Sequence, residues 1–286
     1  MLTLLTAEEL DRLSDWAYGL AMSAEHASYP TYQDGIKTQT EFLRRARAGL
    51  TRPCEEVLCF THAGRLCGWI HWYWQREERY ASTCSFLVED HAETALAELF
   101  ERVEAVCPDA TLDIGLDGEN LAAMAACQGK GFALLESSVN HTFLFTEAPP
   151  CAMPTDVAPL AEADWPDFCR LHDDPDMYWT AERIRASGDI WRNYICRRNG
   201  RVLGALSCQT GDWPEIFSVD MAEKRFDAEV YRDLLAACLR DAWASGAKHL
   251  TFFEEQAEAL PILEALGFIR VGRYMAYRKQ LGGKEE

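Results

Sequence analysis

The hydrophobic and polar positions of this chain follow the same succession of periods twice. Each half opens with apolar residues that recur every three or four positions, which indicates amphipathic helices. An alternating pattern follows in each half and is interrupted by a short turn, which predicts a β-hairpin. The predicted helices cover 7–21 and 38–49, then 162–172 and 180–187, and the hairpins pair 57–62 with 66–75 and 194–198 with 202–209.

The remainder of each half also keeps one order: strand, long helix, strand, shorter helix and final strand. These elements are predicted at 83–88, 92–107, 111–116, 120–129 and 139–145, and again at 215–219, 228–245, 249–253, 256–265 and 273–280. Gly131 and Gly267 follow the shorter helices, where a left-handed residue commonly ends a helix. Strands that alternate with helices in this way predict an α/β fold with a mixed sheet between helices.

Two short motifs recur at one constant shift, which indicates a tandem duplication. Gly-Arg-Leu-Cys-Gly at 64–68 returns as Gly-Arg-Val-Leu-Gly at 200–204, and Gly-Phe at 131–132 returns at 267–268. Both shifts equal 136 residues, because 200 − 64 and 267 − 131 give the same number.

A stretch with three prolines, 147–154, separates the two copies and is typical of a stiff linker. The length of 286 residues, about twice that of a common domain, agrees with two copies of one fold. We therefore predict domains at 1–147 and 154–281.

Composition and charge exclude several classes of protein. Hydrophobic residues make up 48% and charged residues 26%, which excludes a disordered or collagen-like chain. The net charge is -18, with acids in excess in both halves, which argues against a nucleic acid or an anionic membrane as partner. No apolar run reaches the roughly 18 residues needed to cross a bilayer. The first residues also lack the basic region of a signal peptide.

The 11 cysteines are scattered along the chain without any Cys-x-x-Cys pair. Such spacing is typical neither of a zinc site nor of a disulfide framework, so no metal is expected. Free thiols in apolar patterns behave as small hydrophobic side chains. They predict a reducing compartment, the cytoplasm.

The order of elements and one helical motif resemble the GCN5-related N-acetyltransferase (GNAT) superfamily. The family's penultimate helix commonly reads Asn-x-x-Ala-x-x-x-Tyr-x-x-x-Gly-Phe. The first copy matches this motif at Asn120, Ala123, Gly131 and Phe132, and the second copy has Gln256, Ala259, Gly267 and Phe268. The resemblance covers nearly the whole chain twice. It implies two tandem acyl-CoA N-acyltransferase-like domains of the α/β class, with acetyl-CoA as the acyl donor and no metal.

In the family that the chain resembles, the phosphates of acetyl-CoA bind at a glycine-rich loop between the fourth strand and the long helix. Backbone N–H groups and the helix N-terminus attract anions there. In the first copy this stretch, 88–93, has no glycine and three acids, which predicts a lost site. In the second copy Lys224 and Arg225 add positive charge although the glycines are missing. These two residues either bind phosphate through their side chains or form an ordinary solvated face.

The donor-site residues that the resemblance implies all lie in the second copy. They are Phe217, Val219, Lys224, Arg225, Phe226, Ala228 and Gln256.

Transfer of an acyl group from a thioester to an amine needs a base, donors for the carbonyl oxygen and an acid for the thiolate. Glu215 stands where several relatives place the base, and a surface glutamate is the alternative. The relatives' tyrosine of the penultimate helix is replaced by Cys127 and Leu263. Tyr274 and Tyr277 lie on the last strand, where one of them could reach the cleft; Tyr277 is taken as the catalytic candidate, with packing as the alternative. His141 occupies the position of Tyr277 in the first copy, by the 136-residue shift.

One predicted strand, 68–74, is unusually aromatic. Alternation places Trp72 and Trp74 on one face and Trp69, His71 and Tyr73 on the other. Large rings on both faces predict burial on both. They form either an inter-domain core or a wall that binds a cation.

Three functions stay open at this point. The favoured one is transfer of an acetyl group from acetyl-CoA to a primary amine of a small molecule or peptide. In that reading the second domain holds the donor and the first shapes the acceptor site. The alternatives are a catalytically inactive GNAT-fold binding or regulatory protein, and a scaffold for assembly. The acceptor is left open between an amino sugar, a polyamine, a peptide N-terminus and another small amine, and a homodimer is left open too.

Overall fold

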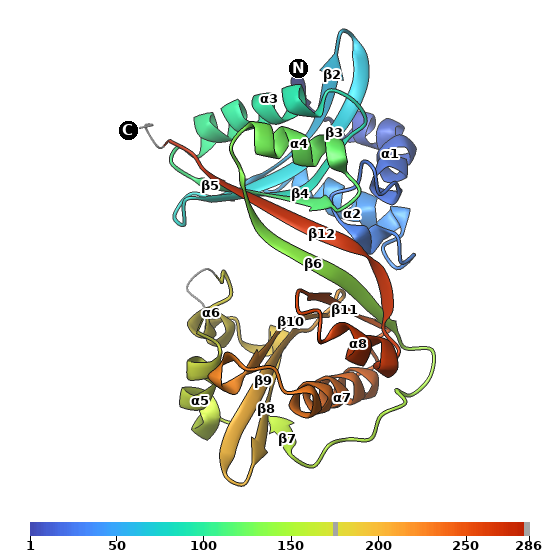
Figure 1. Cartoon of the computed structure of the whole chain (residues 1–286). Helices are drawn as coiled ribbons and strands as arrows, with labels where there is room; N and C mark the ends of the chain where they lie inside the picture. Colours follow the sequence, from blue (N-terminus) through green and yellow to red (C-terminus); the bar gives the residue numbers. More distant parts are fainter. Residues whose placement is uncertain (174–176, 283–286) are drawn as a thin grey trace. The chain divides into compact units, whose positions relative to one another are not determined.

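The chain folds into two compact units, and each of them takes its last strand from the other copy of the repeat. The computed structural model describes residues 1–173 and 177–282 (Figure 1). Unit 1 comprises Met1–Val139 and Val271–Glu286, and unit 2 comprises Asn140–Arg270. The chain therefore passes from unit 1 to unit 2 within one strand and returns within another.

Unit 1 is a mixed sheet with helices on both faces. Its strands lie in the order β1-β2-β3-β4-β5-β12, and β4–β5 is the parallel pair. In chain order the elements are β1 (Leu2–Leu4), α1 (Ala7–Met22), the 3-10 turn η1 (Pro30–Tyr32), α2 (Gln39–Gly49), β2 (Glu55–His62), β3 (Arg65–Gln75), β4 (Tyr80–Val88), α3 (Ala92–Val106), β5 (Thr111–Asp117), α4 (Leu121–Gly129), the start of β6 (Ala133–Leu144) and most of β12 (Ile269–Gln280).

The aromatic strand β3 supplies side chains to both faces of this sheet. Trp72 and Trp74, with ring centroids 4.7 Å apart, pack in the core under α3 and α4. Trp69 packs in the opposite core under α1 and α2. The predicted alternation is confirmed, and helices of unit 1 itself cover both faces (Figure 1). The core that holds Trp72 and Trp74 also contains Met275 and Tyr277 from β12 of the second copy.

Unit 2 repeats this architecture. Its strands lie in the order β6-β11-β10-β9-β8-β7, and β10–β11 is parallel. After β6 the elements are β7 (Val157–Pro159), η2 (Glu162–Asp164), α5 (Trp165–Leu171), α6 (Ala181–Ala186), η3 (Gly188–Ile190), β8 (Trp191–Arg198), β9 (Arg201–Gln209), β10 (Glu215–Met221), η4 (Ala222–Lys224), α7 (Ala228–Ala244), β11 (His249–Glu254) and α8 (Leu260–Leu266). One core lies under α7 and α8, and a smaller one lies under α5 and α6.

The last strands of the two copies are exchanged. In unit 1, β12 pairs with β5 from Tyr274 opposite Asp117 to Gln280 opposite Thr111. In unit 2, the end of β6 lies beside β11, and Phe143 packs in the core of that unit. The predicted boundaries, 1–147 and 154–281, follow the repeat in the sequence. The compact units instead change at Val139/Asn140 and at Arg270/Val271.

Local sequence signals explain how the elements begin and end. Thr6 and Glu9 form the capping box at the start of α1, with both reciprocal hydrogen bonds present. Asn199 and Gly200 both have positive φ, as a two-residue hairpin turn requires. Gly267 ends α8 at φ 97°. No helix in the described part of the chain is long and apolar enough to cross a membrane.

The exchange predicts which unit a mutation at the end of the chain destabilises. Tyr277 is 1% exposed in the core of unit 1, so Tyr277→Ala should lower the free energy of unfolding by about 3 kcal/mol or more. Tyr277→Phe is the control, because it loses only the 3.4 Å hydrogen bond from Gln128, worth about 1 kcal/mol. Urea titration measures both changes. Backbone hydrogen exchange should become faster in β5 for Tyr277→Ala. Faster hydrogen exchange confined to β11 would contradict the assignment of β12 to unit 1.

Candidate functional site

In each unit the two parallel strands of the sheet pair over a short distance and then separate. β10 pairs with β11 at Glu215 and Ile216, while β10 itself continues to Met221 beside β9. β4 pairs with β5 from Tyr80 to Ser82 and continues to Val88 beside β3. The strands diverge toward their carboxyl ends, where α/β sheets commonly bind ligands. We therefore take this end of each sheet as the candidate site.

A β-bulge in β10 changes which side chains face each helix layer. The pairing with β9 shifts between Ile216 and Ser218, so Phe217 is the additional residue. Ile216 and Val219 belong to the core side of α7 and α8. Phe217 packs on the α5–α6 core, with its ring 5.8 Å from that of Trp191. Phe217 and Val219, two half-buried residues assigned to the donor site, therefore lie on opposite faces of the sheet.

The bulge also brings β10 to a buried histidine that sequence reasoning missed. His172 Nδ1 lies 2.8 Å from Asp220 Oδ2, and its Nε2 lies 2.8 Å from the carbonyl oxygen of Trp179. Both partners offer oxygen atoms that can accept hydrogen bonds from the ring. Ser218 Oγ approaches the same Nδ1 at 3.3 Å. Through these contacts His172 links the C-terminal end of α5 to β10.

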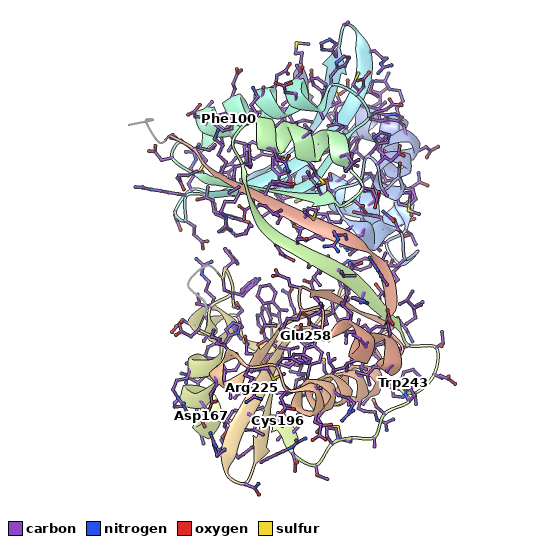
Figure 2. All side chains as sticks on the ribbon, in the orientation of Figure 1. Phe100, Asp167, Cys196, Arg225, Trp243 and Glu258 are labelled. Carbon is purple, nitrogen blue, oxygen red and sulfur yellow. The ribbon has the colours of Figure 1, made fainter. Side chains whose placement is uncertain are left out.

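The segment between β10 and α7 carries the predicted phosphate-binding side chains. Glu223 and Lys224 both have positive φ, which turns the backbone sharply before the helix. The exposed Lys224 Nζ donates to the carbonyl oxygen of Asp173 at 3.0 Å. Arg225 is exposed in the same segment (Figure 2). The structure thus places both cations at the carboxyl end of β10, where they were predicted.

The N-terminus of α7 is already capped by a carboxylate. Asp227 Oδ1 accepts hydrogen bonds from the backbone N–H groups of Glu229 at 3.0 Å and Val230 at 3.1 Å. Ala228, assigned to the donor site, is the exposed first residue of this helix. An incoming phosphate must therefore displace Asp227 or bind through side chains.

A buried polar pair lies behind this loop, at the end of β11. The hydroxyl of Tyr231 donates to Glu254, and both side chains are buried. Burial raises the pKa of Glu254, and burial also raises the pKa of Tyr231. The half-buried Phe226 lies over Tyr231 with ring centroids 5.3 Å apart. Gln256 has an exposed side chain, and its backbone N–H donates to Glu254 Oε1 at 2.7 Å.

The equivalent loop of unit 1 is acidic, as the sequence indicates. Asp90 Oδ1 accepts from the backbone N–H of His91, the N-cap of α3, at 2.8 Å. Arg65 pairs with the other oxygen of Asp90 at 2.7 Å. At the end of β5 the buried Asp117 makes a hydrogen bond similar to that of Glu254, because it too accepts from the backbone N–H two residues later. Burial likewise raises the pKa of Asp117.

The two predicted catalytic residues lie in different units. Glu215 is half-buried at the start of β10 in unit 2. Tyr277 is packed in unit 1, because β12 completes the sheet of that unit. The residue that the exchange delivers to unit 2 at the position of Tyr277 is the fully buried His141. The structure therefore does not bring Glu215 and Tyr277 together in one unit.

Neither replacement for the family's tyrosine lies in a reactive setting. Cys127 is buried in the core under α3 and α4, and burial raises the pKa of its thiol to about 12. Leu263 is buried under α7 and α8. A cavity of about 200 Å³ in unit 2 lies elsewhere, between β8, β9 and the C-terminal end of α7.

A second cluster of polar side chains lies in unit 1, on the face covered by α1 and α2. Glu55 Oε2 accepts from Arg45 at 2.6 Å and lies 2.9 Å from His71 Nε2. Arg45 also lies 3.2 Å from Cys84 Sγ. Hydrogen bonds from His71, Arg45 and Arg52 outweigh burial and lower the pKa of Glu55. Burial lowers the pKa of His71 and raises that of Cys84 to about 11.

Comparison with solved structures identifies the fold. A GCN5-related N-acetyltransferase from Sphaerobacter thermophilus aligns over 98% of this chain and 95% of its own, at 12% identity and a TM-score of 0.62. A tandem GNAT protein from the clavulanic acid biosynthesis pathway aligns over 100% and 99%, at 13% identity and a TM-score of 0.57. A glucosamine N-acetyltransferase region of a fungal multi-domain β-N-acetylglucosaminidase aligns over 98% of this chain and 38% of that chain, at 10% identity and a TM-score of 0.61.

No protein-family model matches the sequence, and no curated protein matches it. The structural likenesses establish the fold: this chain has the GNAT acyltransferase fold in a tandem arrangement. The predicted fold class and the predicted resemblance are confirmed.

The buried Glu254 predicts a pH dependence of stability. Its pKa is raised in the folded chain, so Glu254 binds a proton more tightly in the folded chain than in the unfolded chain. Stability must then fall as pH rises from the unfolded value toward the raised one. Glu254→Gln removes this titration. As pH rises above the range in which an unfolded carboxyl titrates, the variant should gain unfolding free energy relative to the native chain, measured by urea titration. A difference that stays unchanged as pH rises would show that Glu254 keeps an ordinary pKa.

Proposed function

We propose that the protein is an acyl-CoA-dependent N-acyltransferase that transfers an acetyl group from acetyl-CoA to a primary amine of a small molecule or peptide. One observation carries the proposal. The chain has the fold of N-acetyltransferases over its whole length, and in unit 2 the parallel strands separate beside an exposed loop that carries Lys224 and Arg225, called the basic loop below. The separated strands give the donor a place to lie, and the loop gives its phosphates a counter-charge.

Charge assigns the donor to unit 2 rather than unit 1. The loop of unit 2 offers Lys224 and Arg225, and Arg232 is exposed on the first turns of α7. The loop of unit 1 offers Glu89 and Asp90 instead. Phosphates are attracted to the first set and repelled by the second. The phosphate contact in unit 2 is made by long basic side chains, since Asp227 covers the helix N-terminus.

In the proposed reaction a neutral amine attacks the thioester carbonyl, the C–S bond breaks, and CoA leaves as a thiolate that takes up a proton from water. Glu215 accepts the proton that the amine loses, directly or through water. Its strand position supports this role: alternation along β10 places Glu215 on the same side as Phe217, toward α5 and α6 and away from α7. We therefore expect the acceptor amine on the α5–α6 side of β10, beside Phe217. The described cysteines are free thiols, which supports the cytoplasm as location.

Two variants of the basic loop test donor binding. Lys224→Ala/Arg225→Ala should weaken the binding of acetyl-CoA at least about tenfold, measured by calorimetry, because it removes both phosphate contacts. Lys248→Ala/Arg270→Ala is the matched control, since both residues are exposed in unit 2 and the change of charge is the same. Asp227→Asn keeps the helix cap but removes its charge, and it should bind acetyl-CoA more tightly. Equal affinities for all these chains would refute the assignment to this loop.

The role of Glu215 is tested by turnover. Glu215→Gln should lower kcat by about a hundredfold or more while the affinity for acetyl-CoA stays the same. The assay follows release of the CoA thiol with glucosamine, putrescine and a peptide N-terminus as acceptors. Glu258→Gln is the control, because Glu258 is exposed in the same unit (Figure 2). Equal turnover by both variants would remove Glu215 from the mechanism.

A second candidate function is binding without catalysis. It is favoured by Asp227, which occupies the helix N–H groups that a pyrophosphate would use, and by the absence of the tyrosine at positions 127 and 263. This candidate predicts that acetyl-CoA binds to the basic loop and that none of the three acceptors is acetylated. A scaffold would show neither binding nor turnover.

A further inference from the structure

Three side chains from three neighbouring strands of unit 1 meet under α2. Glu55 begins β2, His71 lies in β3 and Cys84 lies in β4. One ligand atom of each lies within 4.8 Å of the other two. Within the described residues this is the one group of three such side chains close enough to hold a metal ion. The spacing along the chain gave no sign of it, because each strand contributes a single residue.

The sheet geometry explains how the three come together. His71 is opposite Val57, so Glu55 is its diagonal neighbour on the same face. The pairing of β3 with β4 shifts between His71 and Trp72, which makes Cys84 the additional residue of a β-bulge. The bulge therefore turns Cys84 toward the other two side chains. Bulges commonly re-aim a side chain next to a functional site.

The backbone of α2 packs closely against the imidazole of His71. Gly49, in the last turn of α2, has no side chain, and a Cβ there would lie 2.5 Å from His71 Nε2. Gly49 has no positive φ, so the backbone does not require glycine at this position. What requires it is the close approach of α2 to the nitrogen that also faces Glu55.

A cation already lies between the two acidic ligands. The guanidinium of Arg45 is 2.6 Å from Glu55 Oε2 and 3.2 Å from Cys84 Sγ. The side chain of Arg45 is 37% exposed, whereas those of His71 and Glu55 are 4% and 10% exposed. Arg45 can therefore move into solvent while the three ligands stay fixed by the strands. Arg52 contacts the other oxygen, Glu55 Oε1, at 2.9 Å and can remain there.

We propose that Glu55, His71 and Cys84 form a site for one zinc-type divalent metal ion, which displaces the guanidinium of Arg45. A carboxylate, an imidazole and a thiolate are ligands that Zn²⁺ prefers, and three protein ligands leave a fourth position for water or another molecule. The exchange balances in charge. Zn²⁺ brings two positive charges, while the guanidinium leaves the ligands and the thiol of Cys84 loses its proton to solvent. This site lies in unit 1 and does not depend on the proposed acyl transfer.

Cobalt is the probe, because a thiolate bound to Co²⁺ gives a charge-transfer band that other ligands do not. The full chain, reduced with a phosphine, is titrated with Co²⁺ and should show one equivalent with this band. Cys84→Ser should abolish the band, and Cys59→Ser should keep it, since Cys59 is a half-buried thiol of the same unit outside the cluster. Zinc is then measured by its displacement of the bound cobalt.

Two further variants leave all three ligands intact. Arg45→Met removes the competing guanidinium and should tighten cobalt binding at least about threefold. Gly49→Ala places a methyl group against His71 Nε2 and should weaken binding about tenfold or more. The proposal is overturned if the native chain and Arg45→Met both lack the band, or if the band survives in folded Cys84→Ser. It is also overturned if Arg45→Met binds no more tightly than the native chain, because the ion then lies elsewhere.

Discussion

The constraint on which the rest of the structure depends is the unsatisfied edge of the fifth strand in each copy. β5 pairs with β4 only over a short stretch. The opposite edge of β5 must be covered by another strand, because its backbone N–H and C=O groups otherwise lack partners in the sheet. β12 covers this edge along the whole of β5, and Arg278 holds Asp113 across the pair through bonds of 2.8 and 2.7 Å. The edge of β11 is covered by β6. Each unit is therefore incomplete without a strand from the other copy.

This constraint decides which residues can act together. The repeat assigns Tyr277 to the second copy and His141 to the first, but the exchanged strands place them the other way round. The last strand of each copy therefore contributes its side chains to the unit of the other copy. β10, its loop and α7 belong to the second copy and also to unit 2.

Most of the fold could be predicted from the sequence, because long periodic segments and a constant 136-residue shift define the same elements twice. β1 and β7 were missed, since three residues are too few to show a period. β6 begins at Ala133 rather than 139, because its first residues are exposed on both faces and carry no alternation. The exchange could not be predicted either, since the pattern of a strand does not reveal which sheet it joins.

The candidate site was only partly visible in the sequence. Lys224 and Arg225 could be predicted because positive charge in a loop between a strand and a helix indicates phosphate binding without knowledge of distant segments. Asp227 could have been found by its position as an N-cap residue before a helical period. His172 and the cluster of Glu55, His71 and Cys84 could not, because their partners come from distant segments that only the folded sheet brings together.

The central claim is that unit 2 holds an acyl-CoA donor at the basic loop while unit 1 does not. Backbone hydrogen exchange of the full chain, with and without acetyl-CoA, tests it most directly because each loop reports separately. The account predicts slower exchange over 219–232 on addition of acetyl-CoA and no change over 88–96. Slower exchange over 88–96, or no change over 219–232 at saturating acetyl-CoA, would contradict it.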